Sequence, residues 1–173
     1  MDRRNSLKQL MLATGSLVAL PAWANGWSMT DLAAHPTSFT VAEQELLSGV
    51  VDTIIPKGDA IGALSVGVDK FLQRLFDDCY EPEIQENIKK QLLAVDSLAG
   101  KLHGRPFTGC GQQQRQALLI SLSESKQKEE KEFFDLVKSE TIRGFRTSRE
   151  VMVDYHGYKV VPGHYYGCVD VNA

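Results

Sequence analysis

The sequence predicts an all-α fold: a compact bundle of about five or six helices that ends in an irregular, aromatic C-terminal tail. Apolar residues recur three and four positions apart through residues 40–154, which is the spacing of one helix face. No strand-like alternation of any length interrupts this pattern, and prolines and glycines divide it into helix-sized pieces. We assign the helical domain to residues 40–173, after a signal peptide at residues 1–24 and a linker at residues 25–39.

The first helix begins at a local signal. Thr40 and Glu43 stand three positions apart and predict a capping box, in which each side chain accepts the other residue's backbone N–H. Pro56 ends the helix, because the residue before a proline disfavours the helical conformation. Its apolar face comprises Leu47, Val50, Val51 and Ile54.

Two further helices follow a glycine-containing loop at residues 57–63. One runs from about Val68 to Cys79, and the next begins at Pro82, a residue well suited to a first helical turn. The second of them continues to about residue 102, where a Gly-Arg-Pro sequence ends it.

Three shorter helices complete the bundle. The apolar spacing predicts helices at residues 112–122 and 129–142, and the mixed charges of residues 126–132 predict a solvated helix start. Gly144 is expected to open the last helix, for which Thr147 and Glu150 form a second capping box.

The N-terminus carries an export pattern. A pair of arginines followed by a hydrophobic residue and a lysine is typical of twin-arginine signals, and here these are Arg3, Arg4, Leu7 and Lys8. The apolar stretch after them has about 11 residues, too short for the roughly 20 that span a bilayer. Ala22 and Ala24 place small residues before a cleavage site after Ala24. We therefore expect export by the twin-arginine translocase to the periplasm.

The mature chain is expected to be acidic. Removing residues 1–24 takes away three basic residues and one acidic residue, so the net charge changes from −3 to about −5. A mixed, acidic surface argues against nucleic acid as a partner.

Three cysteines enter an oxidising compartment, so at least one of them cannot pair within the chain. Cys79 lies on an apolar helix face and is expected to be a buried thiol. Cys168 is expected to bond to another subunit, and a bond between Cys110 and Cys168 is the alternative.

The sequence encodes no cofactor site that we recognise. It lacks Gly-x-Gly-x-x-Gly and Gly-x-Ser-x-Gly motifs, and only two of its four histidines, His156 and His164, lie near one another. Because a catalytic zinc takes three protein ligands, we expect no metal site in this chain. Because the cofactor and nucleophile motifs are missing, we also expect neither a cofactor nor catalytic residues.

The tail concentrates four of the five tyrosines. Tyrosine combines a large apolar face with a polar tip and is enriched at protein interfaces. The sequence leaves two interpretations open: a docking element, or a tail that folds back on the helices. As a docking element its contact residues are Tyr155, Tyr158, Pro162, Gly163, Tyr165, Tyr166, Gly167 and Cys168.

Several segments together resemble one family, gluconate 2-dehydrogenase subunit 3. They are the twin-arginine start, residues 46–56 with their Ile-Ile-Pro ending, Gly62-Ala63 with residues 68–72, and the tail from residue 145 to its Tyr-Gly-Cys ending. The loop after Pro56 departs from the family, where Thr, Asp and a second Pro are common before Gly-Ala. If this loop contacts the large subunit, the departure implies a divergent partner.

The resemblance implies a non-catalytic small subunit that provides the export signal and stabilises its partner. That partner is a large FAD-binding dehydrogenase subunit of the glucose-methanol-choline type, acting on a sugar or sugar acid, often with a cytochrome c as a third subunit that carries haem. Such partners can also hold the complex at the inner membrane. The alternatives are a stand-alone enzyme or ligand-binding protein using His156, His164 and the tyrosines, and a free-standing export chaperone.

Overall fold

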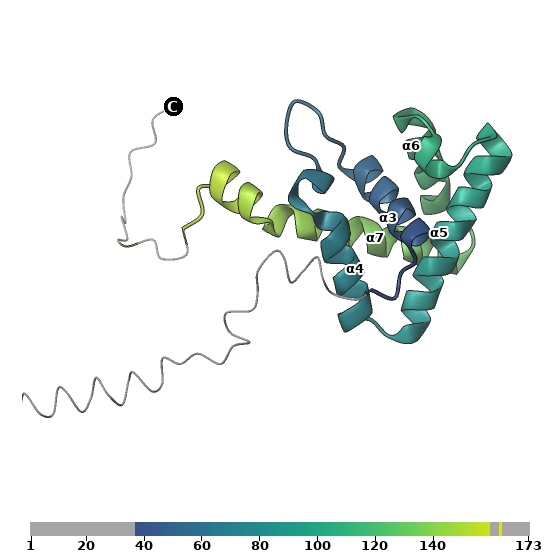
Figure 1. The fold of residues 1–173 in the computed structure, drawn as a ribbon, viewed down its shortest axis with the longest axis horizontal. Coiled ribbons are helices and arrows are strands. Elements are labelled where there is room, and N and C mark those ends of the chain that lie inside the picture. The colour runs from purple at the N-terminus through teal and green to yellow at the C-terminus, as the bar shows by residue number, and fades with distance from the viewer. Residues whose placement is uncertain (1–36, 160–162, 164–173) are drawn as a thin grey trace, which may run out of the picture. The chain divides into compact units, whose positions relative to one another are not determined.

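The computed structural model describes residues 37–159 and residue 163 (Figure 1). All regular structure within these residues is helical, so the predicted all-α class is confirmed for them. The elements are α3 (Val41–Ile54), η2 (Ala63–Val66), α4 (Val68–Cys79), α5 (Pro82–His103), η3 (Phe107–Gly109), α6 (Gln112–Ser123), α7 (Lys128–Thr147) and η4 (Val151–Tyr155). The segments η2 and η3 are short 3-10 helices, and η4 is a π-helical turn.

Helix α3 begins and ends as the sequence predicts. Thr40 Oγ1 accepts the N–H of Glu43 at 3.3 Å, and Glu43 Oε2 accepts the N–H of Thr40 at 2.8 Å. The helix stops at Ile54, two residues before Pro56. Both signals act over a few residues, which is why the sequence alone reveals them.

Helix α3 also forms the centre of the domain, because it contacts α4, α5, α6 and α7. Its Leu47 and Val51 are completely buried. Phe107 of η3, which is completely buried, packs beside Gly49, where a Cβ would be in ordinary contact with Phe107 Cε1 at 3.4 Å. The sequence between α5 and α6 is thereby packed onto the central helix.

Residues 37–39 pack against the helices. Asp77 of α4 accepts hydrogen bonds from Thr37 Oγ1 at 2.6 Å and from the N–H of Ser38 at 3.2 Å. Lys89 of α5 donates to the carbonyl of Ser38 at 3.0 Å. Phe39 is buried, so the chain is part of the core before α3 begins.

Helix α7 corrects the prediction that Gly144 opens a new helix. One helix runs without interruption from Lys128 to Thr147, and Gly144 lies inside it. A Cβ at Gly144 would stand 2.8 Å from Phe71 Cδ1 and 3.4 Å from Val68 Cγ1, both on α4. Gly144 therefore allows α4 and α7 to pack closely, a role that depends on tertiary structure.

The second predicted capping box, between Thr147 and Glu150, is also wrong. Thr147 belongs to α7, and its hydroxyl donates to the carbonyl of Arg143 at 2.9 Å. Ser148 adopts the extended conformation that ends the helix, and its Oγ accepts the N–H of Val151 at 3.4 Å. The break before η4 therefore lies at Ser148.

Cys79 is exposed, contrary to the prediction of a buried thiol, whereas Cys110 is buried. Phe76 is the last buried residue of α4, and Cys79 lies one turn beyond it, where the helix extends past the core. Cys168 lies outside the described residues, so its pairing stays a prediction. No helix in the described part of the chain has the length and apolar character needed to cross a membrane.

The close contact at Gly144 predicts a difference between two helical glycines. Gly100 of α5 is exposed, and a Cβ there would meet nothing within 4 Å. Gly100→Ala should therefore stabilise the domain by about 0.5–1 kcal/mol through helix propensity. Gly144→Ala should instead destabilise it by about 1 kcal/mol, because the ring of Phe71 must move. Urea denaturation measures both values. Equal stabilisation by the two variants would show that the ring of Phe71 moves aside at no cost in stability.

Candidate partner interface

Most of the predicted functional residues lie outside the residues that the structure describes. They are Arg3, Arg4, Leu7 and Lys8 of the export signal, Ala22 and Ala24 of the cleavage site, and Pro162, Tyr165, Tyr166, Gly167 and Cys168 of the tail. Tyr155, Tyr158 and Gly163 are described, and all three are exposed. Gly163 has a φ of 80°, a left-handed conformation that favours glycine.

The turn η4 fixes the beginning of the tail. Val151 is buried, and its carbonyl accepts the N–H of His156 at 3.1 Å. The N–H of Tyr158 donates to the carbonyl of Met152 at 2.9 Å. Tyr155 and Tyr158 nevertheless remain 61% and 51% exposed. A hydrogen-bonded backbone thus presents two large aromatic side chains to solvent, an arrangement suited to a protein contact.

The loop between α3 and η2, residues 56–62, projects from the helices in Figure 1, and its residues 56–60 are exposed. The N–H of Ala63 donates to the carbonyl of Ile55 at 3.0 Å, which joins the two ends of the loop. A Cβ at Gly62 would stand 2.5 Å from the backbone nitrogen of Lys57. The closed base of the loop therefore requires glycine at this position.

This closed base gives a testable difference within one loop. Gly62→Ala places a methyl group against backbone atoms that cannot rotate away, and we expect a loss of about 1–3 kcal/mol in the free energy of unfolding. Gly58 is the matched control, because a Cβ there would meet nothing within 4 Å. Chemical denaturation compares Gly62→Ala with Gly58→Ala. If both variants are as stable as the parent chain, the backbone around Gly62 accommodates a methyl group and glycine is not required there.

Apolar side chains beside these segments are also exposed. Leu64 of η2 is 40% exposed and Phe71 of α4 is 38% exposed. Both η2 and η4 contact α7. Exposed apolar and aromatic side chains thus lie on η2, on α4 and at the end of η4, and all three elements contact α7.

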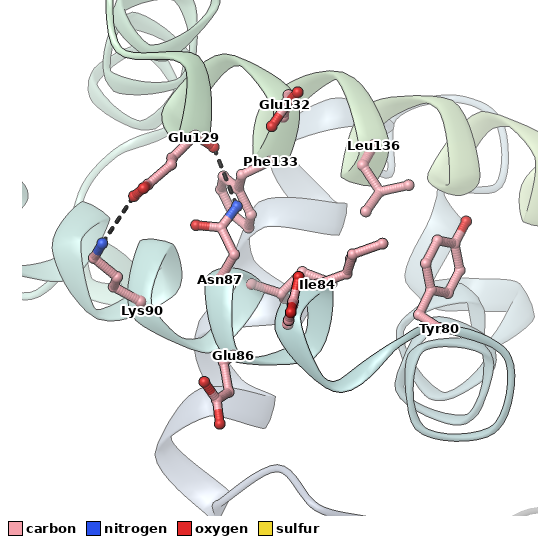
Figure 2. A pocket seen from close by; sticks show the side chains of 11 residues that line it. Tyr80, Ile84, Glu86, Asn87, Lys90, Glu129, Glu132, Phe133 and Leu136 are labelled. Carbon is pink, nitrogen blue, oxygen red and sulfur yellow. Dashed lines mark hydrogen bonds and ion pairs between the residues drawn. The ribbon is translucent and has the colours of Figure 1, made fainter.

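A groove of about 640 Å³ lies between the N-terminal halves of α5 and α7 (Figure 2). It is crossed near one end by Lys90 Nζ, which contacts Glu129 Oε2 at 2.8 Å, and by Asn87 Nδ2, which donates to the carbonyl of Glu129 at 3.3 Å. The hydrogen bond and the charge of Lys90 lower the pKa of the exposed Glu129 carboxyl. The lining residues are Tyr80, Glu83, Ile84, Glu86, Asn87, Ile88, Lys90, Glu129, Glu132, Phe133 and Leu136.

Tyr80 is the lining residue that links the groove to a buried carboxylate. Its hydroxyl donates to Glu140 Oε1 at 3.3 Å, and Arg143 Nε lies 2.9 Å from Glu140 Oε2. Burial raises the pKa of Tyr80, and the negative charge of Glu140 raises it further. The phenol therefore stays neutral at physiological pH and keeps its donor role.

The described residues contain no group of three or more His, Cys, Asp or Glu side chains that could hold a metal ion. His103 is partly buried at the end of α5, and His156 is exposed. His35 and His164 lie outside the described residues. The absence of a cofactor from this chain stays a prediction.

The fold makes this chain a small all-α protein whose candidate contact surfaces are an aromatic end, a projecting loop and a groove. A family model for gluconate 2-dehydrogenase subunit 3 matches residues 41–163. The chain therefore belongs to the gluconate 2-dehydrogenase subunit 3 family, and the resemblance seen in the sequence is confirmed. The family description names a subunit, which implies a dehydrogenase complex of several subunits. Comparisons with curated proteins and with solved structures give no match.

Proposed function

We propose that this chain is the non-catalytic small subunit of an FAD-dependent sugar or sugar-acid dehydrogenase of the glucose-methanol-choline type. It supplies the twin-arginine signal for the complex and stabilises the flavoprotein subunit. The flavin and the reacting substrate belong to that partner, and a cytochrome c is a third partner where haem is present. The complex works in the periplasm, where its partners can hold it at the inner membrane.

The family match over residues 41–163 is the observation that carries this proposal. The N-terminal arginine pair supports it, because the twin-arginine route carries folded proteins, and a chain without a recognised cofactor motif gains from that route when it accompanies a folded partner. The exposed Tyr155 and Tyr158 supply a surface for that partner.

Purification tests the division of labour between the subunits. The chain produced alone should be colourless and free of metal, whereas the chain produced together with the flavoprotein should elute with it as a yellow complex. Absorption spectra and metal analysis of both samples give the result. Stoichiometric flavin, haem or zinc in the isolated chain would contradict the proposal and favour a stand-alone enzyme or ligand-binding protein.

A further inference from the structure

The groove between α5 and α7 has an apolar centre that is open to solvent. Ile84 of α5 and Leu136 of α7 face one another across it (Figure 2). Ile84 is 36% exposed, while Ile88 and Phe133 close the floor and are each 1% exposed. An apolar side chain inserted here would contact Ile84 and Leu136 at the sides and Ile88 and Phe133 below.

The rim of the groove is acidic. Four glutamates line it, against one lysine, Lys90, which is already paired with Glu129. Glu132 pairs with Lys128 at 3.4 Å, but both side chains are more than half exposed, and such a pair is weak and exchanges readily. The four glutamates are Glu83, Glu86, Glu129 and Glu132.

We propose that this groove binds a segment of a partner subunit that inserts an apolar side chain between Ile84 and Leu136 and places lysine or arginine side chains against the glutamates. The acidic rim selects a basic segment, because charge complementarity steers association and sets the register of the contact. The groove has the volume of one anchoring pocket rather than of a whole interface, so it holds the anchor of a larger contact.

This contact is separate from the one proposed for the tail. Leu136 precedes the end of α7 at Thr147 by three helical turns, about 16 Å. The N-terminal half of α7 lines the groove, and its C-terminal end leads to η4 and the exposed tyrosines. Helix α7 therefore connects two surfaces, each of which can engage its own partner segment.

Photo-cross-linking in cells that make the whole complex tests the inference. A benzophenone amino acid replaces Ile84 in the groove, or Leu93 as the control, which lies on α5, is 49% exposed and does not line the groove. The cross-linked peptide is identified by mass spectrometry. We expect position 84, and not position 93, to capture a peptide of another subunit in which an apolar residue lies beside lysine or arginine.

Charge variants complete the test. Glu83→Gln with Glu132→Gln should lower the yield at position 84 about five- to tenfold, whereas Glu45→Gln with Glu124→Gln, outside the groove, should not. An absent cross-link, an acidic peptide, capture of this chain's own termini or equal yields at both positions would overturn the inference. Any of these results with the flavoprotein still bound would leave the proposed function intact.

Discussion

Replacing Arg3 and Arg4 by lysine is expected to remove nearly all flavin dehydrogenase activity from the periplasm and to retain it in the cytoplasm. The substitution keeps both positive charges but replaces the planar guanidinium groups with ammonium groups, and the two are not equivalent at a recognition site that reads geometry. Neither residue belongs to the described helical domain, so the folded subunit should not change. Because we propose that this chain supplies the export signal for the complex, the flavoprotein should stay in the cytoplasm with it.

The measurement is dehydrogenase activity in separated periplasmic and cytoplasmic fractions. Arg105→Lys with Arg149→Lys is the matched control, since both arginines are exposed on the described domain and the chemical change is the same. Control cells should export the complex normally. Unchanged periplasmic activity in the Arg3→Lys, Arg4→Lys variant would rule out a shared address on this chain.

The features that the sequence predicted correctly depend on local interactions. The capping box of Thr40 and Glu43 forms within one helical turn, and Pro56 and Pro82 act on neighbouring backbone. Helical spacing also placed most of the core, because a buried face repeats every three to four residues. The all-α class follows from these signals without knowledge of tertiary packing.

The errors arise where packing between helices decides the outcome. Gly144 has the local character of a helix break, yet it lies inside α7, where the lack of a Cβ leaves room for the ring of Phe71 on α4. The apolar spacing of α4 continues to Cys79, but the core ends at Phe76. Periodicity locates a helix face and says nothing of how far the neighbouring helices extend.

The groove is a site that the sequence did not reveal. Residues 126–132 predicted only a solvated helix start, and Glu129 and Glu132 are indeed exposed. Their second role arises because α5, about 40 residues earlier in the chain, lies beside α7 and brings Ile84 and Lys90 to the same groove. The charge pattern was the available signal, but the apolar centre belongs to both helices and could be seen only in the fold.

Truncation after Asp154 is expected to abolish co-purification of the flavoprotein while the helices remain folded. The cut removes the exposed side chains of Tyr155, at the end of η4, and of Tyr158, three residues further on, together with the rest of the tail. Loss of aromatic anchors at an interface typically costs about 2 kcal/mol or more, which corresponds to roughly 30-fold weaker binding. Val151, which packs η4 onto the domain, is retained, so circular dichroism and the melting temperature should change little.

A second truncation, after Lys159, separates the two parts of the tail. It keeps Tyr155 and Tyr158 with the hydrogen bond from Tyr158 to Met152, and removes Tyr165, Tyr166 and Cys168. If Tyr155 and Tyr158 provide the anchor, this variant should still retain the flavoprotein. If Tyr165 and Tyr166 provide it, both truncations should lose the flavoprotein. Full retention by the chain that ends at Asp154 would contradict tail docking altogether. The contact would then be sought at the loop of residues 56–62, whose ends are joined by the hydrogen bond from Ala63 to Ile55 and whose residues 56–60 are exposed.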